Sequence, residues 1–190
     1  YAKRIIDIIT DYTVGDGITP VGPGEIGRFV DAFWHHPQNR LDLRLPDLMD
    51  ELSRSGDLFL ALFRNPADGM SYVRAVPKSE IVEIVTAEND WEREVGYVVR
   101  GGIEEGKKGG KGEREQGSVG GSLSPLPPFS ASPHPLPIGS TLFLSPAHPD
   151  AAAADAVMLH YSINRPVGAL MGESELASIL PALRWYNRML

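Results

Sequence analysis

Hydrophobic residues recur at helical spacing in three segments of the first part of the chain. The spacing predicts helices over residues 2–13, 25–36 and 45–54. Each segment ends where a helix is expected to stop: the first at a Gly-Asp-Gly turn, the second just before a proline and the third at a Ser-Gly pair. The third segment carries Pro46, which suits the first turn of a helix. The chain up to residue 55 is therefore expected to be helical.

After residue 56 the hydrophobic pattern changes to that of strands. Strands are predicted at residues 57–63, 71–76, 80–86 and 94–100, and an Asn-Pro-Ala-Asp-Gly turn joins the first two as a hairpin. One more strand is predicted near residues 156–163. A helix follows over 173–190, in which Pro181 forces a kink or a restart. Helices followed by an antiparallel meander indicate an α+β fold.

Residues 101–150 differ in composition from the segments on either side. Glycine, lysine and glutamate dominate the first half of this stretch, and serine and proline the second half. Such compositions bury too little apolar surface to offset the entropy of ordering, so the stretch is predicted to be a disordered insert. It is expected to form an enlarged loop between the strands at 94–100 and 156–163. The chain thus divides into residues 1–100, the insert at 101–150, and residues 151–190.

Composition and charge limit the classes of function. The 190 residues include no cysteine, which excludes disulfides and thiolate metal sites. No apolar run approaches the roughly 20 residues of a membrane helix. Eighteen basic residues against 25 acidic ones give a net charge of -7, so any contact with DNA is expected to be loose. Because Tyr1 opens a helical pattern and Leu190 lies inside another, we expect the chain to be part of a longer protein.

Several short motifs, taken in order, resemble the wing region of tailed-bacteriophage portal proteins, the head-to-tail connectors. The resemblance covers roughly residues 1–100 and 156–190 and omits the insert. It rests on Arg4-Ile5-Ile6-Asp7 with Val14-Gly15-Asp16-Gly17, on Ser55-Gly56-Asp57-Leu58-Phe59-Leu60, on Val73-Arg74-Ala75-Val76-Pro77 with Glu80-Ile81, and on His160-Tyr161, Asn164-Arg165-Pro166, Gly168 and Gly172-Glu173-Ser174-Glu175-Leu176.

The resemblance implies a structural protein and not an enzyme. Portal proteins form a ring, usually dodecameric, at one capsid vertex, and double-stranded DNA passes through it non-specifically during packaging and ejection. The ring docks the terminase large subunit and binds capsid and head-completion proteins. These properties imply a place in the virion, and in the host cytoplasm during assembly. In this family a strand ending in His and a Gly-x-Ser-x-Leu turn lead into the helix directed toward the stem, which lies beyond this chain.

The best candidates for a contact surface lie on the last predicted helix. Arg184 and Arg188 are one helical turn apart and flank Trp185. They are interpreted as a contact with a neighbouring subunit first, and with DNA in the channel second. No catalytic, cofactor-binding or metal-binding residue is assigned. The adjacent pair His35-His36, for example, cannot readily face one metal ion, because ligands on one helix face lie three or four residues apart.

Two other classes of function remain as alternatives. One is a small soluble hydrolase that uses Ser174 and His160, although Ser174 lacks the Gly-x-Ser-x-Gly elbow and is better interpreted as a helix N-cap. His160 is better interpreted as a packed, hydrogen-bonded strand residue. The other alternative is an unrelated α+β binding module. We also expect an apolar face of Leu176, Leu180 and Leu183 to lack a partner within the chain, which favours self-association.

Overall fold

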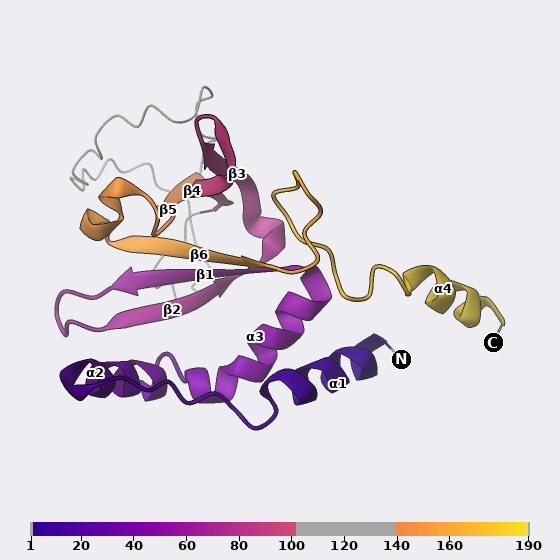
Figure 1. Cartoon of the computed structure of the whole chain (residues 1–190), viewed down its shortest axis with the longest axis horizontal. Helices are drawn as coiled ribbons and strands as arrows, with labels where there is room; N and C mark the ends of the chain where they lie inside the picture. The colour runs from indigo at the N-terminus through magenta and orange to yellow at the C-terminus, as the bar shows by residue number, and fades with distance from the viewer. Residues whose placement is uncertain (1, 102–139, 190) are drawn as a thin grey trace, which may run out of the picture.

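The computed structural model describes residues 2–101 and 140–189 and has the predicted α+β fold (Figure 1). Three helices precede a six-stranded sheet, and a last helix extends away from the body. The elements are α1 (Ala2–Val14), α2 (Gly24–His35), α3 (Leu41–Ser55), β1 (Asp57–Arg64), β2 (Ser71–Val76), the 3-10 helix η1 (Lys78–Glu80), β3 (Ile81–Ala87), β4 (Asp90–Arg100), β5 (Ser140–Leu144), the 3-10 helix η2 (Pro149–Ala153), β6 (Ala156–Ser162) and α4 (Leu180–Met189).

The sheet is mixed, so the prediction of a purely antiparallel meander was wrong. Its strand order is β2-β1-β6-β5-β4-β3. The strands β2, β1 and β6 form one antiparallel half, and β5, β4 and β3 form the other. The two halves meet where β5 and β6 run parallel, and Leu144 opposite Val157 is the register position that joins them. The backbone connection between the halves is therefore short.

The prediction of disorder over residues 101–150 was wrong for its last part. Residues 140–150 contain β5 and the start of η2, and Phe143 of β5 is buried in the core. The aromatic and aliphatic residues of this short strand contribute enough buried surface to order it. The connection from β4 to β6 was expected to be an enlarged loop, but it includes β5, which lies between those two strands in the sheet. Residues 102–139 lie outside the described part of the chain.

Two helices begin more than one residue away from their predicted starts. The third helix begins at Leu41 and not at residue 45, since Arg40 takes a left-handed conformation that starts the helix and Leu41 packs into the core. Pro46 consequently lies inside the helix. The last helix begins at Leu180, with Pro181 in its first turn, so the proline marks a restart. Residues 173–179 were predicted to be helical, but residues 173–174 are irregular and residues 175–179 form turns.

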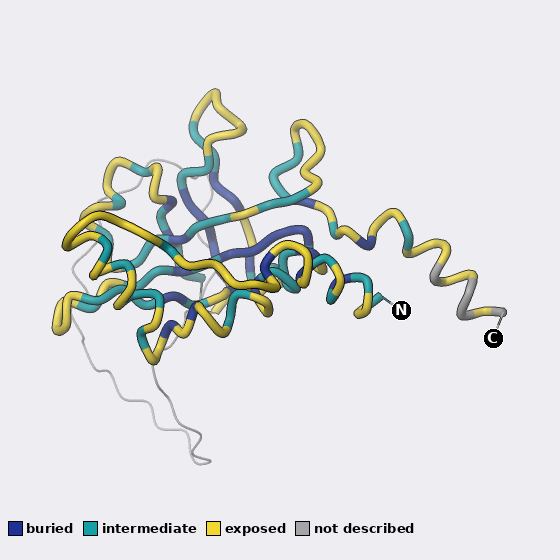
Figure 2. Tube along the Cα trace, turned by 60° about the horizontal axis from the view of Figure 1, so that its bottom comes forward, coloured by how far each residue is buried: buried dark blue, intermediate teal, exposed yellow. Residues whose placement is uncertain are grey.

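Alternation along β1 divides the apolar residues between two cores. Phe59 and Ala61 face a cluster that gathers residues from all six strands, which requires the sheet to curl around it. Leu58 faces the opposite side, where Leu48 of α3 and Val73 of β2 complete a second cluster. Figure 2 shows the buried positions concentrated in the strands, with exposed residues over much of the helices and loops. The first cluster is enclosed by the curled sheet, and the second packs the helices against the other face of the sheet.

The apolar face predicted for the last segment is only partly exposed. Leu176 is 7% exposed and belongs to the interior, so that part of the prediction was wrong. Leu180 is 42% exposed, as expected, and the side chain of Leu183 lies outside the description. Within residues 2–101 and 140–189, no helix has the length and hydrophobicity required to span a bilayer.

Gly172 provides a direct test of the close packing between the last loop and the start of β1. A methyl group at this position would collide with the backbone oxygens of Ile163 and Gly56. We expect Gly172→Ala to lower the free energy of unfolding by about 2–4 kcal/mol, in the range of severe packing defects. Gly168→Ala is the matched control: Gly168 has φ of 81° but open space around it, so the cost is backbone strain of about 1 kcal/mol. Urea unfolding of both variants measures the difference, and equal losses would contradict this account.

Candidate functional site

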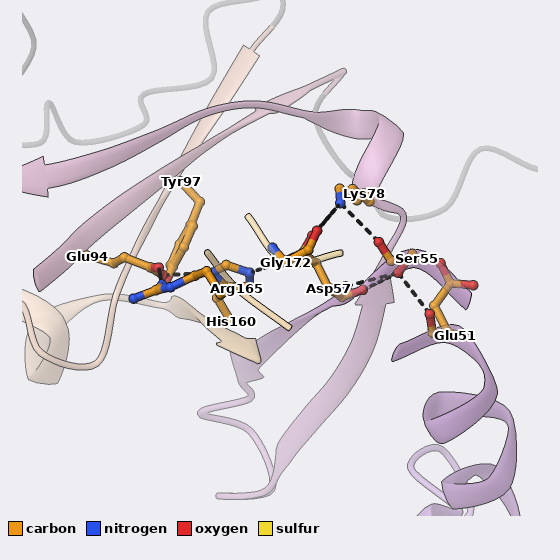
Figure 3. A network of polar contacts seen from close by, with 9 residues as sticks. All are labelled: Glu51, Ser55, Asp57, Lys78, Glu94, Tyr97, His160, Arg165 and Gly172. Carbon is orange, nitrogen blue, oxygen red and sulfur yellow. Dashed lines mark hydrogen bonds and ion pairs between the residues drawn. The ribbon is translucent and has the colours of Figure 1, made fainter. Parts of the chain in front are cut away.

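Five charged side chains from separate parts of the chain meet where the sheet opens (Figure 3). They are Asp57 at the start of β1, Lys78 of η1, Glu94 of β4, His160 of β6 and Arg165 of the following loop, and we call them the ionic network. In this region β4 and β6 have passed the ends of their pairing with β5. Side chains therefore connect the two halves of the sheet where backbone hydrogen bonds do not.

His160 is the centre of the ionic network, and its side chain is 1% exposed. Its Nδ1 lies 2.9 Å from Oε2 of Glu94, and its Nε2 lies 2.9 Å from Oδ1 of Asp57. An ionised carboxylate only accepts hydrogen bonds, so both ring nitrogens must donate. With both carboxylates ionised, this geometry assigns His160 as a doubly protonated imidazolium. Its ring stacks on Phe59 with centroids 4.2 Å apart, which fixes the plane of the ring.

The pKa values of the paired groups shift in the directions that this arrangement demands. Burial by itself would lower the pKa of His160, but the hydrogen bonds to Glu94 and Asp57 outweigh it and raise the pKa above the usual 6.5. Burial by itself would raise the pKa of Glu94, but hydrogen bonds from His160 and Tyr97 hold that pKa below its usual value. Burial, followed by the hydrogen bond to Glu94, raises the pKa of the Tyr97 hydroxyl.

Asp57 connects the ionic network to the backbone around it. Its Oδ1 accepts from His160 and from the backbone N–H of Gly172 at 2.7 Å. Its Oδ2 makes no further hydrogen bond of good geometry, but lies 2.5 Å from Nζ of Lys78, so its charge is paired. Lys78 also donates to the carbonyls of Ser55 and Gly172. The carboxylate of Asp57 thus links the end of α3, η1 and the last loop.

Both carboxylate oxygens of Glu94 accept hydrogen bonds. Its Oε2 accepts from His160 and from the Tyr97 hydroxyl at 2.8 Å, and its Oε1 accepts from Arg165 at 3.0 Å. The ionic network therefore combines two carboxylates with three cationic side chains, all engaged with one another. A buried ion pair stabilises a fold only when such partners satisfy both charges. With both ring nitrogens occupied, His160 is placed as a structural cation and not as a proton acceptor.

A surface pocket of about 500 Å³ adjoins the ionic network. It occupies the opening between β4 and β6 and is lined by Glu92, Arg93, Glu94, Tyr97, Ser145, Pro146, Ala147, Leu159 and His160. Two of its polar lining residues, Glu94 and His160, already bond to each other. Within the described ranges, no group of three or more potential His, Cys, Asp or Glu ligands is placed to hold a metal ion.

The two residues of the hydrolase alternative, Ser174 and His160, make their hydrogen bonds to different groups. The hydroxyl of Ser174 donates to the carbonyl of Ser53 at 3.1 Å and accepts from the N–H of Leu176. His160 is committed to Asp57 and Glu94. Ser174 does cap a turn through its hydroxyl, but α4 begins six residues later, so its prediction as the N-cap of the last helix was wrong. The interpretation of His160 as a packed and hydrogen-bonded strand residue is confirmed.

The predicted contact residues lie apart from the ionic network. Arg184, Trp185 and Arg188 are exposed on α4, with Trp185 68% exposed. Sequence reasoning missed Asp57 and Glu94 as partners of His160, and Lys78 as the partner of Asp57. Asp57 and His160 are 103 positions apart and Glu94 and His160 are 66 apart, and a single charge at the end of an apolar strand usually marks the surface. The only local signal was the placement of a titratable histidine within an apolar strand.

No family model matches the sequence, and no curated protein matches it either. The resemblance to portal proteins therefore depends on the motifs in the chain itself.

The ionic network predicts a stability maximum in mildly acidic solution. His160 has a raised pKa, so its contribution is complete below the unfolded value near 6.5 and is lost as pH rises through the folded pKa. Glu94 has a lowered pKa, so its contribution is complete above the unfolded value near 4.5 and is lost as pH falls through the folded pKa. We expect the thermal unfolding temperature to be highest between about pH 4.5 and 6.5 and to decline on both sides.

The control for the alkaline side is a pair of histidine variants. His160→Gln is expected to remove the decline above pH 6.5, whereas His35→Gln, on the exposed end of α2, is expected to retain it. Nuclear magnetic resonance of the His160 ring through the same range measures its protonation directly. A neutral ring at pH 6 would contradict the imidazolium assignment.

Removing the charge of Asp57 is expected to be costly. Asp57→Asn keeps the size of the side chain but leaves Lys78 without its buried counter-charge and His160 with Glu94 as its remaining carboxylate. Breaking one partner of a buried pair typically costs about 3–5 kcal/mol. The matched control is Asp47→Asn on the exposed face of α3, for which we expect a change within about 0.5 kcal/mol. Chemical denaturation measures both, and a small effect at Asp57 would indicate that the ionic network is not a major support.

Proposed function

We propose that this chain is a structural subunit of a tailed-bacteriophage portal ring, through which DNA is packaged into the capsid and later ejected. The proposal begins from the order of the motifs that resemble the portal wing, from Arg4 to Leu176. It concerns a mechanical role and not the conversion of a substrate. The remaining support comes from the placement of the last helix, from the ionic network and from the charge of the chain.

The observation that carries the proposal is the position of α4. This helix extends away from the sheet and the other helices (Figure 1). It presents exposed Leu180 and Trp185, and an amphipathic helix of this kind stabilises itself by packing its apolar side against another surface. A ring subunit supplies such a surface from its neighbour. A helix that extends from a wing toward a stem is what the portal resemblance leads us to expect.

The ionic network supports an architectural role. It joins both halves of the sheet and the loop that leads toward α4, so a load on α4 is transmitted to a cross-linked body. Its histidine and carboxylates are occupied by one another, which leaves no acid-base pair poised for catalysis among them. These features favour a ring component over the hydrolase alternative.

The charge of the chain is compatible with the passage of DNA. A net charge of -7 opposes tight neutralisation of phosphates, and a translocation channel requires weak, sliding contact. The partners implied by the family, namely the terminase large subunit, capsid proteins and head-completion proteins, are part of the proposal for the whole protein. The proposal for the whole protein also includes a location in the virion, assembly in the host cytoplasm and a ring of twelve subunits.

Electron microscopy of the complete gene product that contains this chain tests the proposal. We expect closed rings with a central pore, because head-to-tail contacts between identical subunits close when the rotation between them permits. Mass measurement of the same sample gives the number of subunits. A sample that remains monomeric at every concentration tested would refute the proposal.

A further inference from the structure

The hairpin between β3 and β4 displays an exposed tryptophan among acidic side chains. Trp91 is 74% exposed and lies near the start of β4, at a register irregularity between the paired residues Asp90 and Glu94. Glu88, Asp90 and Glu92 around it are exposed as well. We call these four residues the acidic tip. A large aromatic side chain held in water at this position is typical of an interface anchor.

The acidic tip is ordered by local structure. Ala87 pairs with Asp90 across the hairpin, so the connection is a tight turn. Asn89 takes φ of 64° in that turn, a conformation that asparagine adopts more easily than most residues. Trp91 directly follows this tight turn, which limits the backbone entropy that the hairpin end loses on binding.

The exposed side of α4 has the opposite charge and a second exposed tryptophan. Arg184, Trp185 and Arg188 share one side of the helix, since residues three and four apart lie on the same face. The helix, with sequence LPALRWYNRM, contains no acidic residue to neutralise the two arginines. We call these three residues the basic helix face. Tryptophan and arginine are the residue types most enriched at binding hot spots.

The two surfaces are complementary in charge and lie in different parts of the chain (Figure 1). Arginine over a tryptophan ring also gains a cation–π attraction, which either tryptophan offers to the arginines. We propose that the acidic tip of one copy docks on the basic helix face of a second copy. The inference rests on the proposed ring and names the surfaces that join its subunits.

The docking is head-to-tail, which distinguishes it from a symmetric dimer. Because each copy contributes two different surfaces, every bound copy leaves one of each surface available for the next. Such a contact propagates until it closes into a ring. DNA is the competing occupant of the basic helix face, but the acidic tip supplies the counter-charge within the same polypeptide and adds an aromatic partner.

A mixing experiment with the complete protein tests this arrangement. One variant carries Asp90→Asn and Trp91→Ala in the acidic tip, and the other carries Trp185→Ala and Arg188→Gln in the basic helix face. Each variant alone is expected to associate at least roughly 30-fold more weakly than the natural protein, the effect of losing a hot spot. An equal mixture has one intact surface of each kind, and is expected to form complexes of two chains and no larger ring. Mass photometry and sedimentation velocity measure the species.

The controls are equally exposed apolar residues outside both surfaces. Tyr12→Ala and Val167→Ala are expected to leave association unchanged, and circular dichroism verifies that all variants fold. Association that survives both double variants would overturn the inference while leaving the ring proposal standing. Failure of the mixture to form pairs would overturn the head-to-tail contact, as would a helix variant that loses only DNA binding. A natural protein without any association would refute the ring as well.

Discussion

A buried imidazolium bridges the point at which the backbone pairing of the sheet fails. The halves β2-β1-β6 and β5-β4-β3 share only a short parallel contact, and beyond it His160 reaches Asp57 on one side and Glu94 on the other. Burying these charges costs desolvation free energy. That cost is offset only because Lys78, Arg165 and the N–H of Gly172 complete the set of partners. The ion pairs lie beside the enclosed core, because the ring of His160 stacks on Phe59 of that core.

The same interactions determine how the chain leaves the sheet. After β6, the N–H of Ile163 donates to the carbonyl of Gly56, and the N–H of Glu175 donates to that of Ser53. Gly172 can approach the backbone oxygens of Gly56 and Ile163 only because it has no side chain. Its N–H donates a hydrogen bond to the carboxylate of Asp57. The base of the segment that leads to α4 is thus attached to the junction of α3 and β1. An attached base and an extended helix together form a defined arm, which suits a subunit that must position its last helix against a neighbour.

Local patterns in the sequence were sufficient for most elements and insufficient for the site. The strand at 71–76 has its predicted bounds, because its turn and its alternation are both encoded within a few residues. The strand β5 was missed since prolines flank its five residues on both sides, and composition outweighed the short apolar core of the segment. The start of α3 was misplaced because Pro46 resembles a first-turn proline. Asp57, Lys78 and Glu94 were missed for a different reason: their roles exist only after distant parts of the chain have come together. Glu94 and His160 are 66 positions apart, and Asp57 and Gly172 are 115 apart.

The distribution of satisfied and unsatisfied groups favours association as the activity of this fold. Inside the sheet, the titratable side chains of the ionic network use their hydrogen-bonding capacity on one another, so a substrate would have to break a buried ion pair to reach His160. On the surface, by contrast, Trp91 and Trp185 remain in water on ordered elements, with acidic neighbours around the first and basic ones around the second. Apolar area kept exposed on both surfaces costs free energy that only a partner can recover. The acidic tip and the basic helix face have opposite charges and lie on one chain. A second copy of the same chain can therefore act as the proposed partner, without any other protein.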